Sequence, residues 1–423
     1  MFGLSAYRVY LMEAGASAFF RSLIYTVLAV YYVQTVGMNP LQLVLVGTTI
    51  EATCFLFQVP TGVIADLHSR RLSVVIGEVL VGVGFVVEGM APLFVAILVA
   101  EVVRGVGETC IDGALQAWIA DEHGEEQLER VFLRAGQVAA VAWIVGPLVS
   151  VGLATIDLRV PILLGAVSMI GLGLFLRAAM AETGFRPAPR EERGSLRASV
   201  GSMVATTRQA SLLVRGRPVL MLLLAVGVVY GAYSEGYDRL WEAQFLTTLS
   251  LPAVGGLDPV VWFGLFSAGS AVIGIVASEV VVRRLAVKGD ARTAKVLLGI
   301  NVALVAGVVA FGLAPSFGVA LAAFWLVGLA RALYWPIAGA WQNRQIDSRV
   351  RATVISAQSQ ADALGQLAGG PAIGAVGNLF GLRAAITAAG LLLTPALVLY
   401  GRAVRRADGV AIDSGAATTV VDA

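Results

Sequence analysis

Long apolar stretches recur along the chain from near residue 9 to about residue 403, separated by short charged or Gly- and Pro-containing connections. A helix of about 20 apolar residues crosses the ~30 Å hydrocarbon core of a bilayer. The pattern therefore predicts twelve membrane-spanning helices. In the first half these cover about 9–34, 41–65, 72–91, 94–117, 133–155 and 160–180, and in the second half about 218–246, 260–282, 294–313, 317–340, 353–376 and 382–402.

The composition agrees with an all-α integral membrane protein. Hydrophobic residues make up 58% of the 423 residues and charged residues only 14%, whereas soluble domains are about 45–50% apolar and about 25% charged. The formal net charge is +2, and the basic residues are spread over several loops. We therefore expect a lipid bilayer as the surrounding medium and no nucleic acid as a partner.

Two polar segments divide the chain. Residues 181–217 are rich in Arg and Ser, and residues 404–423 show no apolar period. We expect an N-terminal six-helix half over 1–180, a cytoplasmic linker over 181–217, a C-terminal six-helix half over 218–403 and a disordered cytoplasmic tail over 404–423. Placing both termini in the cytoplasm leaves only Arg159 and Arg383 outside, as the positive-inside rule favours. The predicted location is the cell membrane, crossed many times.

An internal repeat relates the two halves. GVGETCIDGALQAW (105–118) and GLARALYWPIAGAW (328–341) run from Gly to Ala-Trp over the same spacing, at an offset of 223. Gly146-Pro147 and Gly370-Pro371 are related by an offset of 224, and we assign both pairs to helix packing. Two parallel six-helix repeats joined by a linker are the arrangement of the major facilitator fold, in which the transport site lies between the halves.

Charged residues form a stripe on one expected helix of each half. At about 100° per residue, four side chains of the 94–117 helix fall within an arc of about 80°. Four on the 218–246 helix lie within about 100° of one another. The first stripe consists of Glu101, Arg104, Glu108 and Asp112, and the second of Glu235, Asp238, Arg239 and Glu242.

A charge at the bilayer centre costs about 2.5–3.5 kcal/mol, so neither stripe is expected to face lipid. We interpret them as a substrate and proton pathway in a cavity shared by the halves, joined by the mid-span residues Arg21, Glu51 and Arg331. Glu13, Glu78 and Glu279 lie nearer the cytoplasmic ends, where we expect solvated side chains. A structural alternative remains open. Arg104 with Glu108, and Asp238 with Glu242 or Arg239, would then be packed ion pairs.

The sequence GVIADLHSRR (62–71) resembles a signature of the major facilitator superfamily. Gly62, Asp66, Arg70 and Arg71 match its loop between helices 2 and 3, although Leu67 and Ser69 depart from it. The resemblance implies a cytoplasmic gate, in which the glycine allows close helix packing and the charged residues close the cytoplasmic side.

Three further strings resemble the drug:proton antiporter branch of that superfamily, which contains the tetracycline- and macrolide-type efflux proteins of bacteria. They are SEGYDRLWEAQFL (234–246), GALQAWIADEHGEE (113–126) and RATVISAQSQADALGQLAGGP (351–371). In many proton-coupled relatives, this helix carries an arginine four residues before a Gly-x-Gly sequence, and that position holds Glu101 in this chain. The role assigned to Arg104 therefore rests on its position and charge alone.

Enzymatic chemistry is not expected. The chain has two histidines and two cysteines, and it lacks a Walker A motif and a metalloprotease motif. We predict no metal and no cofactor, with a proton gradient as the driving force, a small-molecule substrate, and function as a monomer. The leading hypothesis is antiport of small amphipathic compounds such as antibiotics. An uptake or facilitated carrier for a metabolite is the alternative, and a non-transporting receptor or scaffold is a third possibility.

Overall fold

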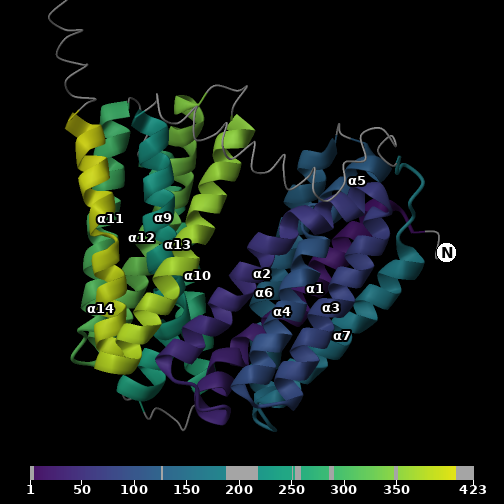
Figure 1. Cartoon of the computed structure of the whole chain (residues 1–423), viewed down its shortest axis with the longest axis horizontal. Helices are drawn as coiled ribbons and strands as arrows, with labels where there is room; N and C mark the ends of the chain where they lie inside the picture. The colour runs from purple at the N-terminus through teal and green to yellow at the C-terminus, as the bar shows by residue number, and fades with distance from the viewer. Residues whose placement is uncertain are drawn as a thin grey trace, which may run out of the picture. The chain divides into compact units, whose positions relative to one another are not determined.

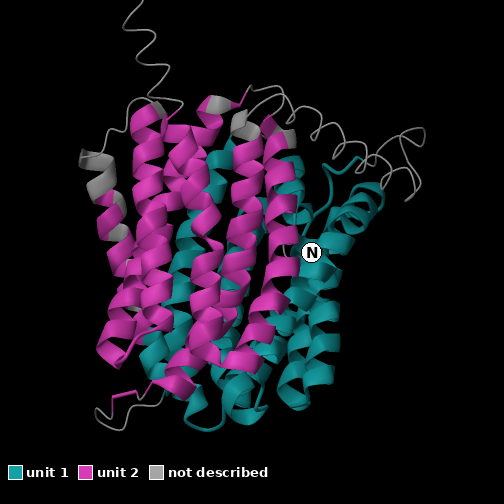
Figure 2. Ribbon diagram, turned by 60° about the vertical axis from the view of Figure 1, so that its left-hand side comes forward, with its two compact units in different colours: residues 1–205, 253–264 teal, residues 206–252, 265–423 magenta. Residues whose placement is uncertain are grey.

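A computed structural model of the chain describes residues 4–124, 127–186, 218–249, 251–252, 259–284, 290–346 and 351–405 (Figure 1). Within these ranges all regular secondary structure is helical. Most of the predicted linker and nearly all of the predicted tail lie outside the described residues. The chain divides into two compact units, coloured separately in Figure 2. Unit 1 holds residues 1–205 and 253–264, and unit 2 holds 206–252 and 265–423.

Seven α-helices lie wholly within the described part of unit 1, and all but α4 begin after a connection that contains a polar residue or a glycine. Asn39 and Gln42 form a reciprocal capping box at the start of the second helix, and the hydroxyl of Ser69 caps the third. Such caps satisfy backbone N–H groups that have no partner within the helix. The helices are α1 (Ala6–Val30), α2 (Pro40–Leu67), α3 (Arg70–Met90), α4 (Phe94–Ile111), α5 (Ala114–His123), α6 (Leu128–Ala154) and α7 (Arg159–Ala179).

The helices that begin in the second half are α9 (Pro218–Ala243), α10 (Pro259–Arg284), α11 (Asp290–Gly312), α12 (Phe317–Gln345), α13 (Arg351–Phe380) and α14 (Leu382–Leu392). After a turn at Leu393 the chain is helical again over 394–405. The first helix of each half ends in a five-residue π-helix, η1 (Tyr31–Thr35) after α1 and η3 (Gln244–Thr248) after α9.

Eight helices in the described part are long and apolar enough to cross a membrane, which supports an integral membrane protein. They are Ala6–Thr35, Pro40–Leu67, Arg70–Met90, Leu128–Ala154, Arg159–Ala179, Ala291–Gly312, Phe317–Arg344 and Leu382–Arg405. Helix α4 is outside this set because its 18 residues include Glu101, Arg104 and Glu108. Three of the other four expected spans, 218–246, 260–282 and 353–376, remain predictions, and the fourth, 94–117, is interrupted.

The expected single helix over 94–117 is wrong. Helix α4 ends at Ile111, Asp112 has extended backbone (φ −62°, ψ 129°), and α5 begins at Ala114. Gly113 between them has φ +77°, a conformation that glycine adopts without a Cβ clash. The offset of 223 places Gly113 on Pro336, which lies inside the continuous helix α12. The same repeat position is thus a break in unit 1 and a proline in unit 2.

Helix neighbours within each unit follow one pattern. In unit 1, α1 packs against α6 and α7, while α3 packs against α4 and α7. In unit 2, α9 packs against α13 and α14, while α11 packs against α12 and α14. Each first helix therefore contacts the same two partners in its unit, as expected of an internal repeat.

Close glycine contacts join α9 to α13. A Cβ atom added at Gly365 would lie 2.1 Å from the Val228 carbonyl oxygen and 2.9 Å from the Ala232 nitrogen. We expect Gly365→Ala to push the helices apart and lower the free energy of unfolding by about 1–3 kcal/mol. Thermal unfolding of the purified protein in detergent measures this loss. Gly339→Ala in α12 is the control, because nothing lies within 4 Å of its added Cβ. Equal stability of the two variants would contradict the packing argument.

Candidate functional site

An ion pair links α1 to α4 in unit 1. The guanidinium of Arg21 binds the carboxylate of Glu108, and its Nε donates a hydrogen bond to Ser17 Oγ at 3.1 Å. The side chains of Arg21 and Glu108 are 17% and 26% exposed, so both remain accessible. The pair is therefore neither sealed in a core nor fully solvated.

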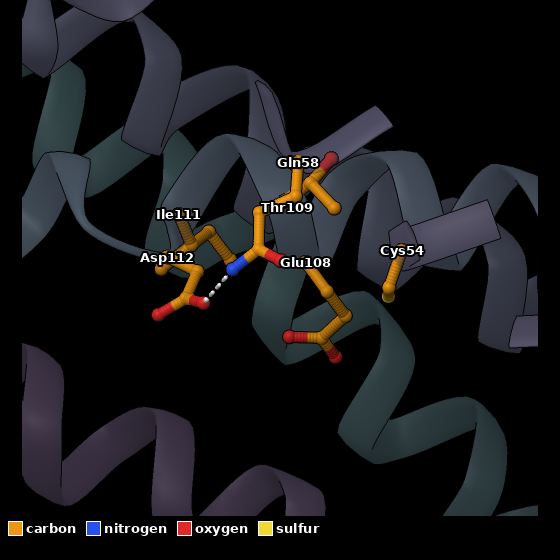
Figure 3. Close-up of a pocket in the computed structure, with 6 residues that line it drawn as sticks. All are labelled: Cys54, Gln58, Glu108, Thr109, Ile111 and Asp112. Atoms are coloured by element: carbon orange, nitrogen blue, oxygen red, sulfur yellow. Dashed lines mark hydrogen bonds between the residues drawn. The ribbon is translucent and has the colours of Figure 1, made fainter. Parts of the chain in front are cut away.

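Glu108 also lines a cavity of about 250 Å³ between α2 and α4 (Figure 3). Asp112, just past the end of α4, accepts a hydrogen bond from Gln58 Nε2 at 3.3 Å (Figure 3). The break after Ile111 sets the position of Asp112 at the cavity wall. The lining residues are Cys54, Gln58, Glu108, Thr109, Ile111 and Asp112.

The other two members of the first stripe belong to a separate, buried cluster. Arg104 Nη2 lies 2.9 Å from Glu101 Oε2, and Arg104 Nη1 lies 3.4 Å from Glu88 Oε1. Tyr32 donates its hydroxyl to Glu88 Oε2 at 2.5 Å, and the guanidinium lies 4.5 Å from the centre of the Phe85 ring. The arginine and the two glutamates are 0–3% exposed. We interpret this cluster as structural.

The expectation that all four stripe residues share one surface is therefore wrong. Arg104 pairs with Glu101 and Glu88 rather than with Glu108, and Asp112 lies beyond the last residue of α4. Helix geometry alone placed the side chains within one arc. In the structure, Arg21 of α1 binds Glu108, whereas Glu88 of α3 binds Arg104, so the stripe is split between two clusters. Glu88 was missed because it lies in the last turn of its span and belongs to no charged stripe.

The solvated positions expected for Glu13 and Glu78 are also wrong. Glu13 is 5% exposed and Glu78 is 0% exposed, although the side chain of Glu279 is exposed as expected. Both buried carboxylates lie on helices of unit 1, Glu13 on α1 and Glu78 on α3. Sequence position relative to a helix end did not reveal the neighbours that cover them.

Unit 2 contains a second interhelical ion pair. Arg331 of α12 forms two hydrogen bonds with Asp238 of α9, at 2.6 Å and 2.7 Å. Its guanidinium lies 5.4 Å and 5.8 Å from the ring centres of Tyr233 and Tyr237. The side chains of Arg331 and Asp238 are 30% and 43% exposed. Two-pronged geometry and partial exposure make this pair both oriented and accessible.

The two ion pairs are related by the repeat with inverted charge. The offset of 223 places Glu108 on Arg331, the acidic member of one pair on the basic member of the other. Their partners Arg21 and Asp238 lie on α1 and α9, the first helix of each half. Each half thus joins its first and fourth expected spans by one arginine and one carboxylate, with the roles exchanged.

The remaining stripe residues lie close to these pairs. Arg239 contacts Glu235 within α9 at 3.3 Å, and Glu242 is partly buried on the same helix, where it interacts electrostatically with Arg239. Glu51 is partly buried on α2, one turn before Cys54 of the cavity.

The loop signature forms ion pairs within unit 1. Arg70 contacts Asp66 at 3.4 Å, binds Asp121 of α5 and donates to the Ala117 carbonyl oxygen at 2.9 Å. Arg71 lies 4.0 Å from Glu182. These contacts tie the junction of α2 and α3 to α5.

Gly62 does not fit the close-packing role that the resemblance implied, since nothing in the described structure lies within 4 Å of a Cβ added there. The Gly-Pro pairs lie inside helices. Gly146 and Pro147 are in α6, where a Cβ at Gly146 would clash with Ser22 of α1. Gly370 and Pro371 are in α13.

Comparisons with known proteins agree with this architecture. A family model described as Major Facilitator Superfamily matches residues 14–312. The uncharacterized MFS-type transporter YxaM of Bacillus subtilis (strain 168) is 21% identical over 385 residues, covering 89% of this chain and 91% of the relative.

Among solved structures, the nucleoside transporter NupG superposes with a TM-score of 0.72 at 11% identity, covering 95% of this chain and 98% of that one. The peptide transporter POT in complex with sulfate gives 0.70 at 16% identity, over 96% of this chain and 96% of that one. The human organic anion transporter MFSD10 gives 0.58 at 18% identity, over 93% of this chain and 99% of that one. At these identities the structures share a fold with this chain and say nothing of its substrate. With its apolar helices and the family match over most of its length, the chain belongs to the Major Facilitator Superfamily and is a membrane-embedded transporter.

Proposed function

We propose that this protein is a proton-coupled antiporter that exports small amphipathic compounds, such as antibiotics, by alternating access. The observation that carries the proposal is the pair of accessible interhelical ion pairs, Arg21 with Glu108 and Asp238 with Arg331, each of which joins the first and fourth expected spans of its half. The proposal includes two six-helix halves in the cell membrane, both termini in the cytoplasm, and function as a monomer.

A carboxylate held by one arginine suits exchange. A proton or a cationic substrate that binds Glu108 competes with Arg21 for the same oxygens, so the two ligands exclude each other at that carboxylate. Mutual exclusion at one carboxylate couples inward movement of a proton to outward movement of a solute. Asp238 in unit 2 offers the same competition, with Arg331 as its cation.

Two observations support the direction and the substrate class. The three strings described above resemble drug:proton antiporters. On α9, Glu235, Asp238 and Glu242 outnumber Arg239, so an amphipathic compound with a basic amine has the complementary charge. One proton entering down about 100 mV supplies about 2.3 kcal/mol, and one pH unit supplies about 1.4 kcal/mol. Together they sustain a gradient of about 500-fold for a neutral solute.

Accumulation in cells tests the proposal. A pump-deficient bacterium that expresses the protein is exposed to a panel of antibiotics and fluorescent cationic dyes, with and without a protonophore. We expect lower accumulation than in cells with an empty vector, reversed by the protonophore. Glu108→Gln should lose about tenfold or more of the export rate, because a neutral amide can neither take up a proton nor attract a cationic substrate.

Glu129→Gln is the matched control. Glu129 is an exposed acid in the first turn of α6, outside both ion pairs, so this variant should export normally. Export that resists the protonophore, or a Glu108→Gln variant as active as the parent, would contradict proton coupling at this site. Inward transport of a metabolite would favour the carrier alternative.

A further inference from the structure

Two buried carboxylates of unit 1 belong to neither of the ion pairs on which the proposed function rests. Glu78 of α3 is 0% exposed, and neither of its carboxylate oxygens has a hydrogen-bond partner of normal geometry. Glu13 of α1 is 5% exposed. The two carboxylates are close enough to repel each other. A buried carboxylate beside a second one calls for a compensating charge or a proton.

Few charged groups surround this pair. Arg21 attracts the carboxylates of both Glu78 and Glu13, and the carboxylate of Glu108 repels that of Glu78. Tyr10 lies beside Glu13 on α1. On the side of α3 that packs against α7, the neighbour of Glu78 is Gly173, which carries no charge. Arg21 is therefore the one cation acting on Glu13 and Glu78 within the described part of unit 1.

That single cation is already engaged. Arg21 binds Glu108 and donates to Ser17. Three carboxylates, Glu13, Glu78 and Glu108, thus share one guanidinium. Keeping both buried carboxylates ionised would leave uncompensated charge in a low-dielectric environment, at a cost of several kcal/mol. While Arg21 stays on Glu108, the lower-energy state is therefore one in which the buried pair is protonated.

The helix geometry gives Arg21 a second position. Glu13, Ser17 and Arg21 are spaced by four residues, so they follow one another along one face of α1. Long helical side chains lean toward the N-terminus, which directs Arg21 toward Ser17 and then Glu13. Ser17 also interacts with Glu78. If Glu108 releases the guanidinium of Arg21, the carboxylates of Glu13 and Glu78 are therefore the next groups that it can bind.

A groove gives this pair access to solvent. Glu13, Ser17 and Arg21 line a cavity of about 450 Å³ whose other walls come from α5 and α6, including Phe132 and Trp143. Glu78 has no exposed surface and does not line this cavity, whereas Glu13 does. Protons therefore enter and leave through Glu13 at the groove.

We propose that Glu13 and Glu78 form a proton site, and that Arg21 controls its occupancy by moving between Glu108 and the two buried carboxylates. When a cation binds Glu108, the guanidinium turns to the buried pair and the proton leaves through the groove. When the cation departs, Arg21 returns to Glu108 and the pair takes up a proton. Only this coupling role rests on the proposed function, because protonation of the pair needs no substrate.

Infrared difference spectroscopy of the purified protein tests the site without a substrate. During a pH titration, we expect the carbonyl stretch of a protonated carboxylic acid at neutral pH, and a decrease of this band in both Glu78→Gln and Glu13→Gln. Glu108→Gln should shift the midpoint of this band to lower pH by about one unit or more, because the freed Arg21 favours the ionised pair. The isosteric replacements preserve volume, and size-exclusion chromatography checks that each variant is folded.

Glu129→Gln is the matched control. It removes an exposed carboxylate of unit 1 outside both ion pairs and should leave the midpoint of the band unchanged. The proposal would be overturned if no carboxylic acid band responded to either replacement, or if Glu108→Gln left the midpoint where it is in the parent. A parent protein that shows the expected band but exports none of the compounds in the cell panel would instead count against the proposed function alone.

Discussion

Replacing Arg21 with glutamine is expected to slow proton-driven transport by about 30-fold or more while the protein remains folded. Arg21 is the partner of Glu108 and the one cation acting on the buried carboxylates Glu13 and Glu78 in the described part of unit 1. A hydrogen bond to a charged group contributes about 1.5–3 kcal/mol. If the step that exchanges Arg21 between carboxylates limits transport, a rise of about 2 kcal/mol in its barrier corresponds to about 30-fold in rate. Initial rates in membrane vesicles measure it.

Two further variants separate charge from packing. Arg21→Lys keeps the positive charge but not the forked geometry, so it should retain part of the rate. Arg177→Gln removes an exposed arginine from the last turn of α7 and should transport normally. An Arg21→Gln variant as fast as the parent would contradict the shared-cation mechanism.

Replacing Arg104 with methionine should instead destabilise the fold. The guanidinium is 3% exposed and lies between Glu101 and Glu88, with the Phe85 ring against it. Without it two buried carboxylates lose their cation, at a cost of about 3–5 kcal/mol. This is a large share of the roughly 5–15 kcal/mol typical of a folded domain. We expect low yield and a clear fall in the unfolding temperature in detergent.

A compensated variant provides the control for Arg104. Adding Glu88→Gln and Glu101→Gln to Arg104→Met removes the buried charges together, so most of the lost stability should return. If Arg104→Met instead unfolded at the parent's temperature and only lost transport, Arg104 would belong to the transport pathway, as its position in the stripe first suggested.

The apolar pattern carried most of the information about the fold. Because a bilayer requires long apolar helices with satisfied backbone groups, the lengths of these stretches identified the helices well. The break at Asp112-Gly113 was missed, since apolar periodicity continues on both sides of it. The positive φ of Gly113 marks the end of α4, whereas a glycine inside an apolar run is also common where two membrane helices pack closely.

The site was harder to predict than the fold. Charge near the middle of a span singled out Arg21 and Arg331, and the structure places each in an ion pair with another helix. Their role in transport stays a prediction. The partners themselves depend on how helices far apart in sequence pack, so Arg104 was matched with the wrong glutamate. Burial of Glu13 and Glu78 depends on the same packing, which their distance from a helix end does not report.

Proton movement by the purified protein is the most direct test of the central claim. The protein is reconstituted into liposomes with an imposed pH gradient, and the compound with the largest protonophore-sensitive change in the cell panel is added. An internal pH dye and the compound are followed together. The account predicts that the compound moves against its gradient while the pH gradient decays, and that Arg21→Gln reduces both movements together. Transport of the compound at an equal rate without a pH gradient, and with no proton movement, would contradict it.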